Sequence, residues 1–299
     1  MMAQQQDPLE VEAVPDTASM MSATEESVAT GYAAEDVGET KTLEWRRFLT
    51  NGGARVSSWH DVPLFANKKE GTLNAVIEIT RCTQAKMEMA TKEEQAPIKQ
   101  DVKKGKLRDY IVPIEWNYGA FPQTWEQPDH AWAGLEALAT KGDNDPLDLV
   151  DLSKIDVACG SVIQVKLVGV LAMIDEGEVD WKMVVINVAD PLADKINSLK
   201  DAEVHFPGEV GKIREWFTWY KSVDGEKGDG PLGSNKVEGK EPNVFGFDGV
   251  ALDATKALEV VEETHAAWAG LVTGATAADG LSVSCGEAAA LAAKGVSAH

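Results

Sequence analysis

The feature that most limits the fold is the order of short apolar runs and helical periodicity along the chain. Strand-like runs separated by turn signals span Leu73–Thr80, Lys86–Thr91, Ser161–Met173 and Asp180–Val188. Apolar residues at three- and four-residue spacing predict two later helices, marked by Val210, Ile213, Phe217 and Tyr220 and by Leu258, Val261, His265 and Trp268. Asp253 is a suitable N-cap for the second helix. This order predicts one α+β domain, mainly β, with strands first and helices later.

Composition divides the chain into three parts. Residues 1–42 form an acidic leader that carries no Lys or Arg up to Thr40, a composition typical of disorder. Residues 43–271 form the predicted domain, in which residues 224–249 are rich in Gly, Asp, Lys and Pro and predict a long surface loop. Residues 272–299 form an Ala-rich tail, either a frayed helix or disordered. Transit peptides are rich in Arg and poor in acids, so the composition of this leader is not that of a transit peptide. We expect that either an import sequence has been removed or there never was one.

The net charge of -21 constrains the partners of the protein. Nucleic-acid binding depends on Lys and Arg that neutralise phosphates, so we expect no nucleic-acid partner. No stretch approaches the run of roughly 18 apolar residues that a membrane span needs, so we expect no membrane association either. An acidic protein that handles a polyanion needs a divalent cation between the two, although acidity can also serve solubility alone.

The acidic segment from Gly142 to Leu149 is the most informative part of the sequence. Its three carboxylates, Asp143, Asp145 and Asp148, repel one another unless solvent or cations neutralise them. Pro146 disfavours helix at the preceding residue, which predicts a loop or a strand end. An EF-hand calcium loop is excluded, because its sixth position would be Asp148 instead of Gly and its twelfth would be Lys154 instead of Glu. A helix-capping acidic turn remains the alternative.

A second acidic group lies in the segment from Leu171 to Lys182. The pattern predicts a strand, a tight turn containing Gly177 and a returning strand, with Asp175 and Asp180 on the two sides of the turn. Side chains alternate along a strand, so Asp180 and Lys182 share one face. The alternative is a solvent-exposed turn that carries scattered charges.

Basic residues that can bind an anion are few and grouped. Lys86 and Glu88 share one face of a predicted strand, in the same i, i+2 spacing as Asp180 and Lys182. Further groups are Lys103 to Arg108 and the pair Tyr220-Lys221, since Arg and Lys both bind phosphate oxygens. Taken singly, each group is also compatible with a solvated surface turn. The five histidines show no paired spacing, so we interpret them as structural or exposed rather than as metal ligands.

Several segments, in order, resemble the family I soluble inorganic pyrophosphatases, of the longer eukaryotic, plant-plastid-like type. The similarity runs from about Trp45 through Leu271 and includes the segments 59–64, 97–101, 103–108 and 116–126. Asp143 to Leu149 matches the family signature D-x-D-P-x-D, and the segment from Asp175 to Lys182 matches its second acidic motif.

The resemblance implies a closed, OB-like five-stranded barrel flanked by helices, and an enzyme that hydrolyses inorganic pyrophosphate to two phosphates with several Mg²⁺ ions. It implies metal ligands at Asp143, Asp148, Asp180, Asp175 and Glu88, of which Asp143, Asp148 and Asp180 hold the tightest ion. Asp145 would orient or deprotonate the attacking water. Glu78 would be a supporting acid.

The phosphate-binding residues implied by the resemblance are Lys86, Arg108, Tyr118, Lys182, Tyr220 and Lys221, with Tyr118 also counted as catalytic beside Asp145. The chain departs from the family at Ile114, four residues before Tyr118, where many members carry a tyrosine. We do not infer inactivity from this difference, because plant-plastid-like members share it.

Three further expectations concern compartment, assembly and partners, of which the first two follow from the resemblance. The protein is expected in the plastid stroma, or else in the cytoplasm, as a monomer or homodimer. Its loop 224–249 and its termini are candidate surfaces for an unknown protein partner. The alternative functions are a catalytically silent, pyrophosphatase-like structural or interaction subunit, and another metal-dependent phosphohydrolase.

Overall fold

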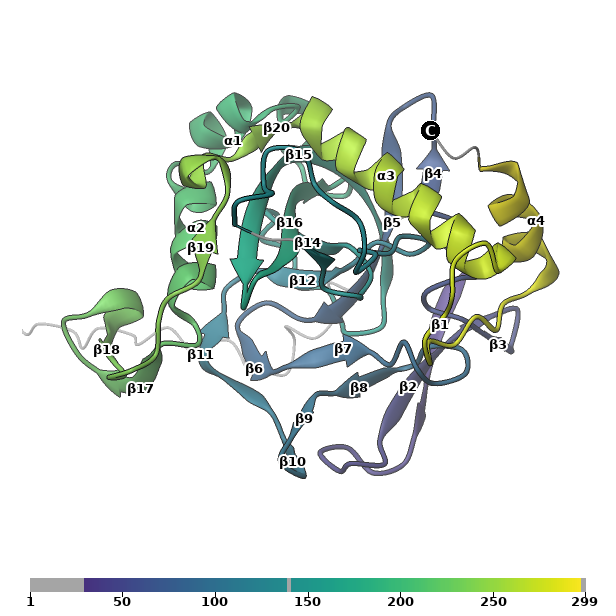
Figure 1. The fold of residues 1–299 in the computed structure, drawn as a ribbon, viewed down its shortest axis with the longest axis horizontal. Helices are drawn as coiled ribbons and strands as arrows, with labels where there is room; N and C mark the ends of the chain where they lie inside the picture. Colours follow the sequence, from purple (N-terminus) through teal and green to yellow (C-terminus); the bar gives the residue numbers. More distant parts are fainter. Residues whose placement is uncertain (1–29, 139–140, 297–299) are drawn as a thin grey trace, which may run out of the picture.

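The computed structural model describes residues 30–138 and 141–296. Its largest sheet is built on five strands whose pairings return to their starting point (Figure 1). In order of pairing these strands are β16 (Glu178–Asn187), β14 (Asp148–Asp151), β12 (Asn117–Ala120), β5 (Thr72–Ile79) and β15 (Val162–Asp175). The last of them, β15, pairs antiparallel with β16 as well as with β5, while β14 and β16 run parallel.

Shorter strands extend this sheet at its margins. They are β4 (Phe65–Asn67) beside β5, β13 (Lys141–Gly142) beside β16, and β19 (Val244–Phe245) and β20 (Leu252–Asp253) beside β15. A second sheet joins β1 (Tyr32–Val37), β2 (Arg46–Asn51), β3 (Ala54–Val56), β8 (Ile98–Gln100) and β7 (Met87–Met89). The second sheet carries Glu88 to the edge of the first, since β5 contacts β7.

Three two-stranded ribbons complete the β structure. They are β6 (Thr83–Ala85) with β11 (Asp109–Ile114), β9 (Val102–Lys103) with β10 (Lys106–Leu107), and β17 (Val223–Lys227) with β18 (Ser234–Lys236). Helices α1 (Leu199–His205) and α2 (Glu209–Trp219) lie on one side of the central strands, and α3 (Ala254–Thr273) crosses another side with α4 (Glu287–Gly295) at its end (Figure 1). Short 3-10 turns occur at Ala193–Lys195, Pro231–Gly233 and Phe247–Gly249. Among the residues described, no helix combines the length and apolar character that crossing a bilayer requires.

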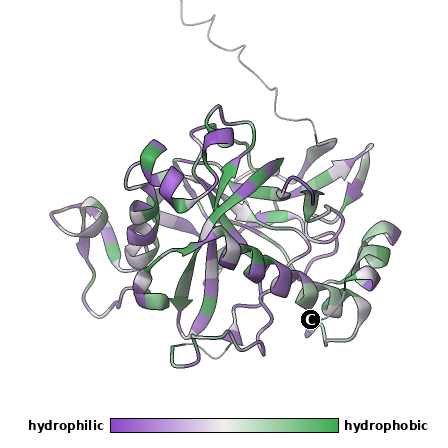
Figure 2. Ribbon diagram, turned by 90° about the horizontal axis from the view of Figure 1, so that it is seen from above, coloured by the Kyte–Doolittle hydropathy of each residue, from purple (hydrophilic) through white to green (hydrophobic). Residues whose placement is uncertain are grey.

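Alternating side chains of the central strands contribute to separate hydrophobic cores, two of which lie beneath the helices. Leu73, Ala75 and Ile77 of β5 belong to a core that α3 covers with Val260 and Val261. The opposite faces of β15 and β16 pack with α1 and α2, through residues such as Leu171, Val184, Ile213 and Phe217. Hydrophobic residues accordingly follow the inner strands, while the outer turns are hydrophilic (Figure 2). The central strands are therefore covered on both faces, so a charged side chain placed there is buried.

The predicted strands and helices are confirmed. The four strand-like runs correspond to β5, β7, β15 and β16, and the two periodic segments correspond to α2 and α3. The Asp253 side chain accepts hydrogen bonds from the backbone N–H groups of Thr255 and Lys256, as an N-cap does. The helix α1 was not expected.

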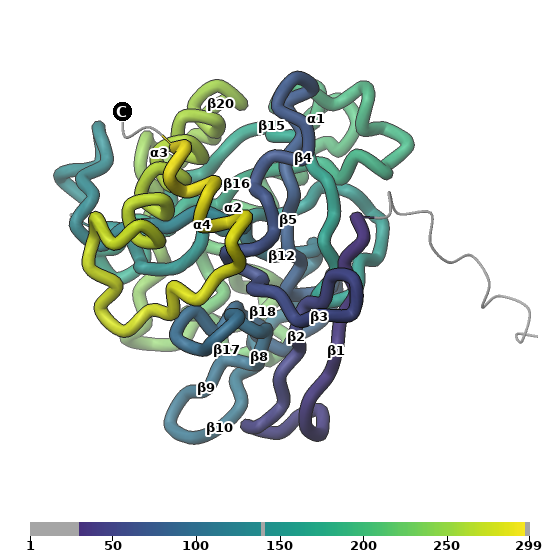
Figure 3. Tube along the Cα trace, turned by 90° about the vertical axis from the view of Figure 1, so that its right-hand side faces the viewer, coloured from purple at the N-terminus to yellow at the C-terminus, as the bar shows by residue number. Residues whose placement is uncertain are grey.

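The structure differs from the expected disordered leader at residues 30–42, whereas residues 1–29 lie outside the described part. Strand β1 pairs with β2 along its whole length, on the flank of the molecule (Figure 3). Two carboxylates of this strand meet arginines: Asp36 pairs with Arg47 at 2.6 Å and Glu35 with Arg55 at 2.7 Å. Composition alone missed this strand because its charge partners lie later in the sequence.

Two other segments are more regular than expected. Residues 224–249 include most of the β17–β18 ribbon, which projects from the body and remains largely exposed (Figure 1). In the tail, α4 packs against α3 and buries Ala289 and Ala293. Small alanine side chains permit this close packing of helices, a tertiary effect that the Ala-rich composition did not disclose. Residues 297–299 lie outside the described part.

Candidate active site

The β15–β16 hairpin places two of the predicted acids. Its turn residues Glu176 and Gly177 both have positive φ, 53° and 86°, as a tight type I′ turn requires. Asp175 therefore pairs with Glu178 at the turn, and Asp180 lies opposite Met173. The predicted hairpin is confirmed. Both aspartates lie on the same face of the hairpin, because Asp180 is opposite Met173 and Met173 is two residues before Asp175 on β15.

Lys182 lies at the centre of the charged cluster. The parallel pairing of β14 with β16 sets it beside Asp148, and alternation sets it on the same face as Asp180. Its ammonium group contacts both carboxylates and lies 3.1 Å from the Tyr118 hydroxyl, which also donates to Asp148. Only 2% of the Lys182 side chain is exposed. A buried ammonium group of this kind is retained only with carboxylates around it.

Gly142 explains how the acidic segment reaches Glu126. A Cβ atom on Gly142 would lie 2.4 Å from the Glu126 carbonyl oxygen, so only glycine permits this approach. The backbone N–H of Asn144 then donates to that carbonyl at 3.0 Å, and the Glu126 N–H donates to the Asp145 carbonyl at 2.9 Å. These two bonds fix the acidic segment against Glu126.

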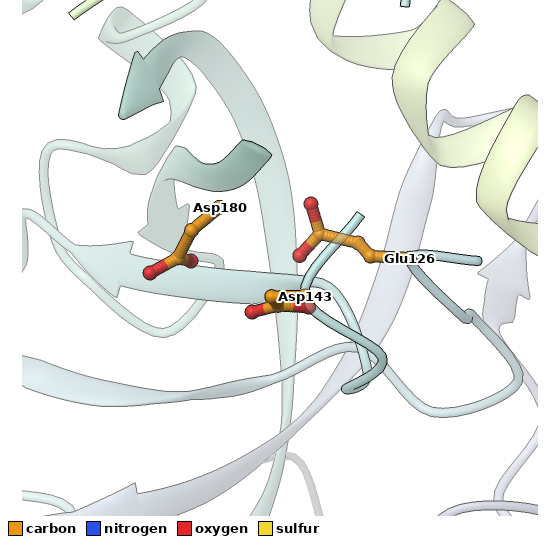
Figure 4. A group of neighbouring side chains, drawn as sticks. All are labelled: Glu126, Asp143 and Asp180. Atoms are coloured by element: carbon orange, nitrogen blue, oxygen red, sulfur yellow. The ribbon is translucent and has the colours of Figure 1, made fainter. Parts of the chain in front are cut away.

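The result is a group of three converging carboxylates, Glu126, Asp143 and Asp180 (Figure 4). One oxygen from each lies within 4.8 Å of the others. Glu126 accepts a bond from the Trp181 N–H at 3.1 Å through one oxygen, while its buried second oxygen has no hydrogen-bond partner among the described residues. Asp175 likewise has one buried oxygen without a partner among those residues. Buried acceptors without a partner are uncommon in proteins, and two of them among neighbouring carboxylates are compatible with a bound cation.

Burial and mutual repulsion raise the pKa values of the cluster. Burial, followed by the charge of Asp148, raises the pKa of Asp145 to about 7. Burial also raises the pKa of Asp180 to about 7, against the opposing effect of Lys182. The pKa values of Glu126 and Asp143 rise well above their usual range because each is buried beside another carboxyl group. The cluster therefore lacks the positive charge that would keep all of its carboxylates ionised.

A second group of charges lies along β7 and the start of β11. Lys86 lies 3.1 Å from Glu88 and 3.0 Å from Asp101, and Arg108 lies 2.7 Å from the same Asp101 oxygen. Asp101 thus holds two cations side by side. Glu78, from β5, accepts a bond from the Met89 N–H at 2.7 Å, and burial raises its pKa well above the usual range.

Two adjacent pockets contain most of the predicted site residues. A small pocket of 70 Å³ is lined by residues that include Glu78, Lys86, Glu88, Tyr118, Asp145 and Asp148. A larger pocket of 590 Å³ is lined by residues that include Lys103, Arg108, Asp175, Tyr220 and Lys221. Lys221 forms an ion pair with Asp175 at the wall of the large pocket.

The structure brings every predicted site residue into one region. The two pockets, the Lys182 contacts and the group of three carboxylates connect them all. Sequence reasoning gave no role to Glu126, Asp101 or Tyr110, which the structure places among them. Glu126 and Asp101 do fall in segments that resemble the family, which was the available signal. His60 and His265 bond to other groups of the fold, consistent with their structural interpretation, and His299 lies outside the described residues.

This arrangement can bind divalent cations and a small polyanion together. Oxygen donors, several of them carboxylates, are the ligands that Mg²⁺ and Ca²⁺ prefer. The cations of the large pocket, Arg108 and Lys221 among them, suit phosphate oxygens. A site that joins both features is suited to phosphoryl transfer.

Comparison with known proteins agrees with this chemistry. The family model described as inorganic pyrophosphatase matches residues 75–269. A relative named soluble inorganic pyrophosphatase 1, chloroplastic, from Chlamydomonas reinhardtii is 46% identical, over 83% of this chain and 82% of its own length. Soluble inorganic pyrophosphatase 6, chloroplastic, from Arabidopsis thaliana is 42% identical, over 83% of this chain and 77% of its own length.

Solved structures give the same result. The structure of inorganic pyrophosphatase from Schistosoma japonicum superposes with a TM-score of 0.77 at 38% identity, over 85% of this chain and 86% of its own. Type I inorganic pyrophosphatase from Toxoplasma gondii superposes with a TM-score of 0.72 at 40% identity, covering 80% of this chain and 99% of its own. Sequence and fold thus agree over most of the chain, which belongs to the family of soluble inorganic pyrophosphatases.

Proposed function

We propose that this protein hydrolyses inorganic pyrophosphate to two phosphates with magnesium ions held by its acidic cluster. The observation that carries the proposal is the meeting of two features: a buried group of carboxylates whose negative charge Lys182 offsets only in part, and a neighbouring pocket lined by Arg108, Tyr220 and Lys221. The first suits divalent cations and the second suits phosphate. The alternative of a silent subunit is not favoured, because the relatives of this chain are named as pyrophosphatases.

The residues present fit a divalent metal ion. Glu126, Asp143 and Asp180 offer oxygens within 4.8 Å of one another, and one buried oxygen of Glu126 has no partner among the described residues. We propose Asp143, Asp148 and Asp180 as ligands of the tightest ion, with Asp175 and Glu88 serving ions that arrive with the substrate. Bound magnesium would supply Lewis acidity, which polarises phosphate oxygens and acidifies water.

Asp145 is the proposed base. The oxygen of the attacking water bonds to one phosphorus while its proton passes to Asp145, and the bond from that phosphorus to the bridging oxygen breaks. The electron pair of that bond stays with the leaving phosphate. Burial and the neighbouring Asp148 raise the pKa of Asp145 to about 7, close to the range in which a general base works near neutral pH.

The remaining residues bind and orient the phosphates. Lys86 and Arg108 are held side by side by Asp101, so their two positive charges are positioned before the substrate arrives. Lys182, Tyr118, Tyr220 and Lys221 supply further donors, with Tyr118 fixed by its bond to Asp148. Glu78 supports β7 through its bond to the Met89 N–H. Groups placed in advance of the reaction lower its barrier, because they need not reorganise in the transition state.

The finer architecture is part of the proposal. The cyclic pairing of β16, β14, β12, β5 and β15 supports a closed OB-like five-stranded barrel. Residues 43–271 would form the catalytic domain, with residues 1–42 as a leader before it and residues 272–299 as a tail after it. We propose the plastid stroma as its compartment, on similarity to relatives named chloroplastic, with a monomer or homodimer as its assembly. Cell fractionation and light scattering test these two points.

Phosphate release from pyrophosphate by the purified chain tests the function. We expect fast release with magnesium, little with calcium in its place, and none with chelator. Asp156→Asn is a matched control, because it removes an exposed carboxylate whose ion-pair partner among the described residues is Arg81, at 3.2 Å. No release from folded, metal-loaded protein would reject the proposal and leave the silent subunit.

A further inference from the structure

Tyr110 has a singular position between the two pockets. Of the described residues, it is the one that lines both the small pocket and the large one. It belongs to β11, two residues after Arg108, and only 6% of it is exposed. The pockets differ in what surrounds them, since the small pocket contains the proposed base Asp145 and the large one contains Lys221.

The ring of Tyr110 is fixed by its neighbours. It meets the Trp216 ring edge-on at a centroid distance of 5.0 Å and the Tyr220 ring edge-on at 5.6 Å. Ile114, the last residue of β11, is fully buried in the same hydrophobic core as Tyr110. An anchored ring of this kind holds its hydroxyl group in one place without an entropic cost on substrate binding.

The hydroxyl group itself is unused. No hydrogen bond joins it to another described residue, which is also true of the Tyr220 hydroxyl, whereas the hydroxyl groups of Tyr32 and Tyr118 each have a partner. The hydroxyl oxygen is not one of the fully buried polar atoms without a partner, so it keeps some accessible surface, and Tyr110 lines both pockets. Burial raises the pKa of Tyr110 above its usual value, which keeps the group protonated as a donor.

We propose that the Tyr110 hydroxyl donates a hydrogen bond to the bridging oxygen of pyrophosphate as the bond to that oxygen breaks. The inference rests on the proposed function. If each pocket takes one phosphate, the oxygen that joins them lies where the pockets meet, beside Tyr110. Negative charge grows on this oxygen when the bond from phosphorus breaks, because the electron pair stays with the leaving phosphate. A fixed donor at that point stabilises the transition state more than the bound substrate.

Tyr110→Phe tests the proposal, since it removes the oxygen and keeps the ring. The loss of a hydrogen bond to a charged group in the transition state should lower kcat on the order of 10- to 100-fold. KM should stay nearly unchanged, because the bond is much weaker in the bound substrate. Tyr32→Phe is the matched control: its hydroxyl bonds to the Asp61 carbonyl at 3.4 Å, away from both pockets, so its kcat should match the wild type. Thermal melting of both variants checks that they fold.

Inhibition by imidodiphosphate supplies a second readout. Its bridging N–H group is a poor acceptor, so Tyr110→Phe should leave its inhibition constant unchanged while kcat falls. Wild-type kcat in Tyr110→Phe would overturn the proposal, and so would a raised KM with a weakened inhibition constant, which would place the hydroxyl on a terminal oxygen. Wild-type protein inactive with magnesium would reject the proposed function itself, a separate result.

Discussion

Two buried polar regions of this molecule are built in opposite ways. In the group of Glu126, Asp143 and Asp180, like charges converge and one Glu126 oxygen has no partner among the described residues. The other region, which we call the C-terminal clamp, consists of His60, Trp268 and Ser282. There, the Trp268 indole N–H donates to Nδ1 of His60 at 2.8 Å, so Nε2 carries the proton and donates to the Ser282 carbonyl, also at 2.8 Å.

The clamp serves the fold. His60 is only 1% exposed, yet both its ring nitrogens are bonded, and the Ser282 N–H donates to the Thr91 carbonyl at 2.8 Å. These contacts hold the segment after α3 against the second sheet. A satisfied buried network stabilises a protein, whereas an unsatisfied one costs free energy unless a ligand completes it. The comparison distinguishes the polar cluster that supports the fold from the one proposed to bind ions and substrate.

The largest expected effect comes from Asp145→Asn. It removes the proposed base, so turnover should fall by roughly 10²- to 10⁴-fold. Magnesium binding, followed by calorimetry, should persist, because the tight ligands remain. The free energy of unfolding without metal should not fall, since one charge leaves a repulsive cluster. Near-normal turnover would show that Asp145 is not the base, and Asp156→Asn should behave as wild type.

Arg108→Ala should have the next largest effect. It removes a charged donor from the large pocket, and kcat/KM should fall by about 10- to 100-fold, as expected for hydrogen bonds to charged groups. Arg108→Lys is the control that keeps the charge but loses the planar fork, and it should recover part of the loss. An unchanged dependence of rate on pyrophosphate concentration would exclude Arg108 from the site.

Trp268→Phe tests the clamp. It leaves Nδ1 of His60 without its donor, so the free energy of unfolding should fall by about 1–3 kcal/mol, measured by urea titration. The turnover of the folded variant should match that of the wild type, because the clamp lies outside both pockets. A lower turnover of the folded variant would mean that the clamp and the site are coupled.

The smallest expected effect is a difference in the sign of pH dependence, measured without metal. Burial lowers the pKa of His60, against the opposing charge of Asp61, so the unfolded chain binds more protons at low pH. The stability that the clamp contributes therefore falls as pH drops below about 6.5. Asp145 and Asp180 have pKa values raised to about 7, so their contribution falls as pH rises from about 4 towards 7. Urea titrations of Asp145→Asn and His60→Gln at several pH values separate the two contributions to the free energy of unfolding. Equal slopes of this free energy against pH in the two variants would contradict the comparison.

Local patterns in the sequence predicted much of this protein. Alternation placed Asp180 with Lys182 and Lys86 with Glu88, and the tight turn at Gly177 placed Asp175 near Asp180. The helices α2 and α3 followed from apolar spacing. Each of these inferences concerns neighbours in sequence, whose relative positions are fixed by the geometry of one strand, turn or helix.

Tertiary structure decided how separate segments meet. Glu126 joins Asp143 because Gly142 permits backbone contact, and Asp148 meets Lys182 through the parallel pairing of β14 and β16. Tyr110 separates two pockets that exist only once β7, β11 and β15 have assembled. The sequence by itself supplied most of the candidate side chains for metal and phosphate, although it gave no role to Glu126. Only the fold decided which of them are buried together, because burial and long-range contact depend on packing between segments rather than on spacing along the chain.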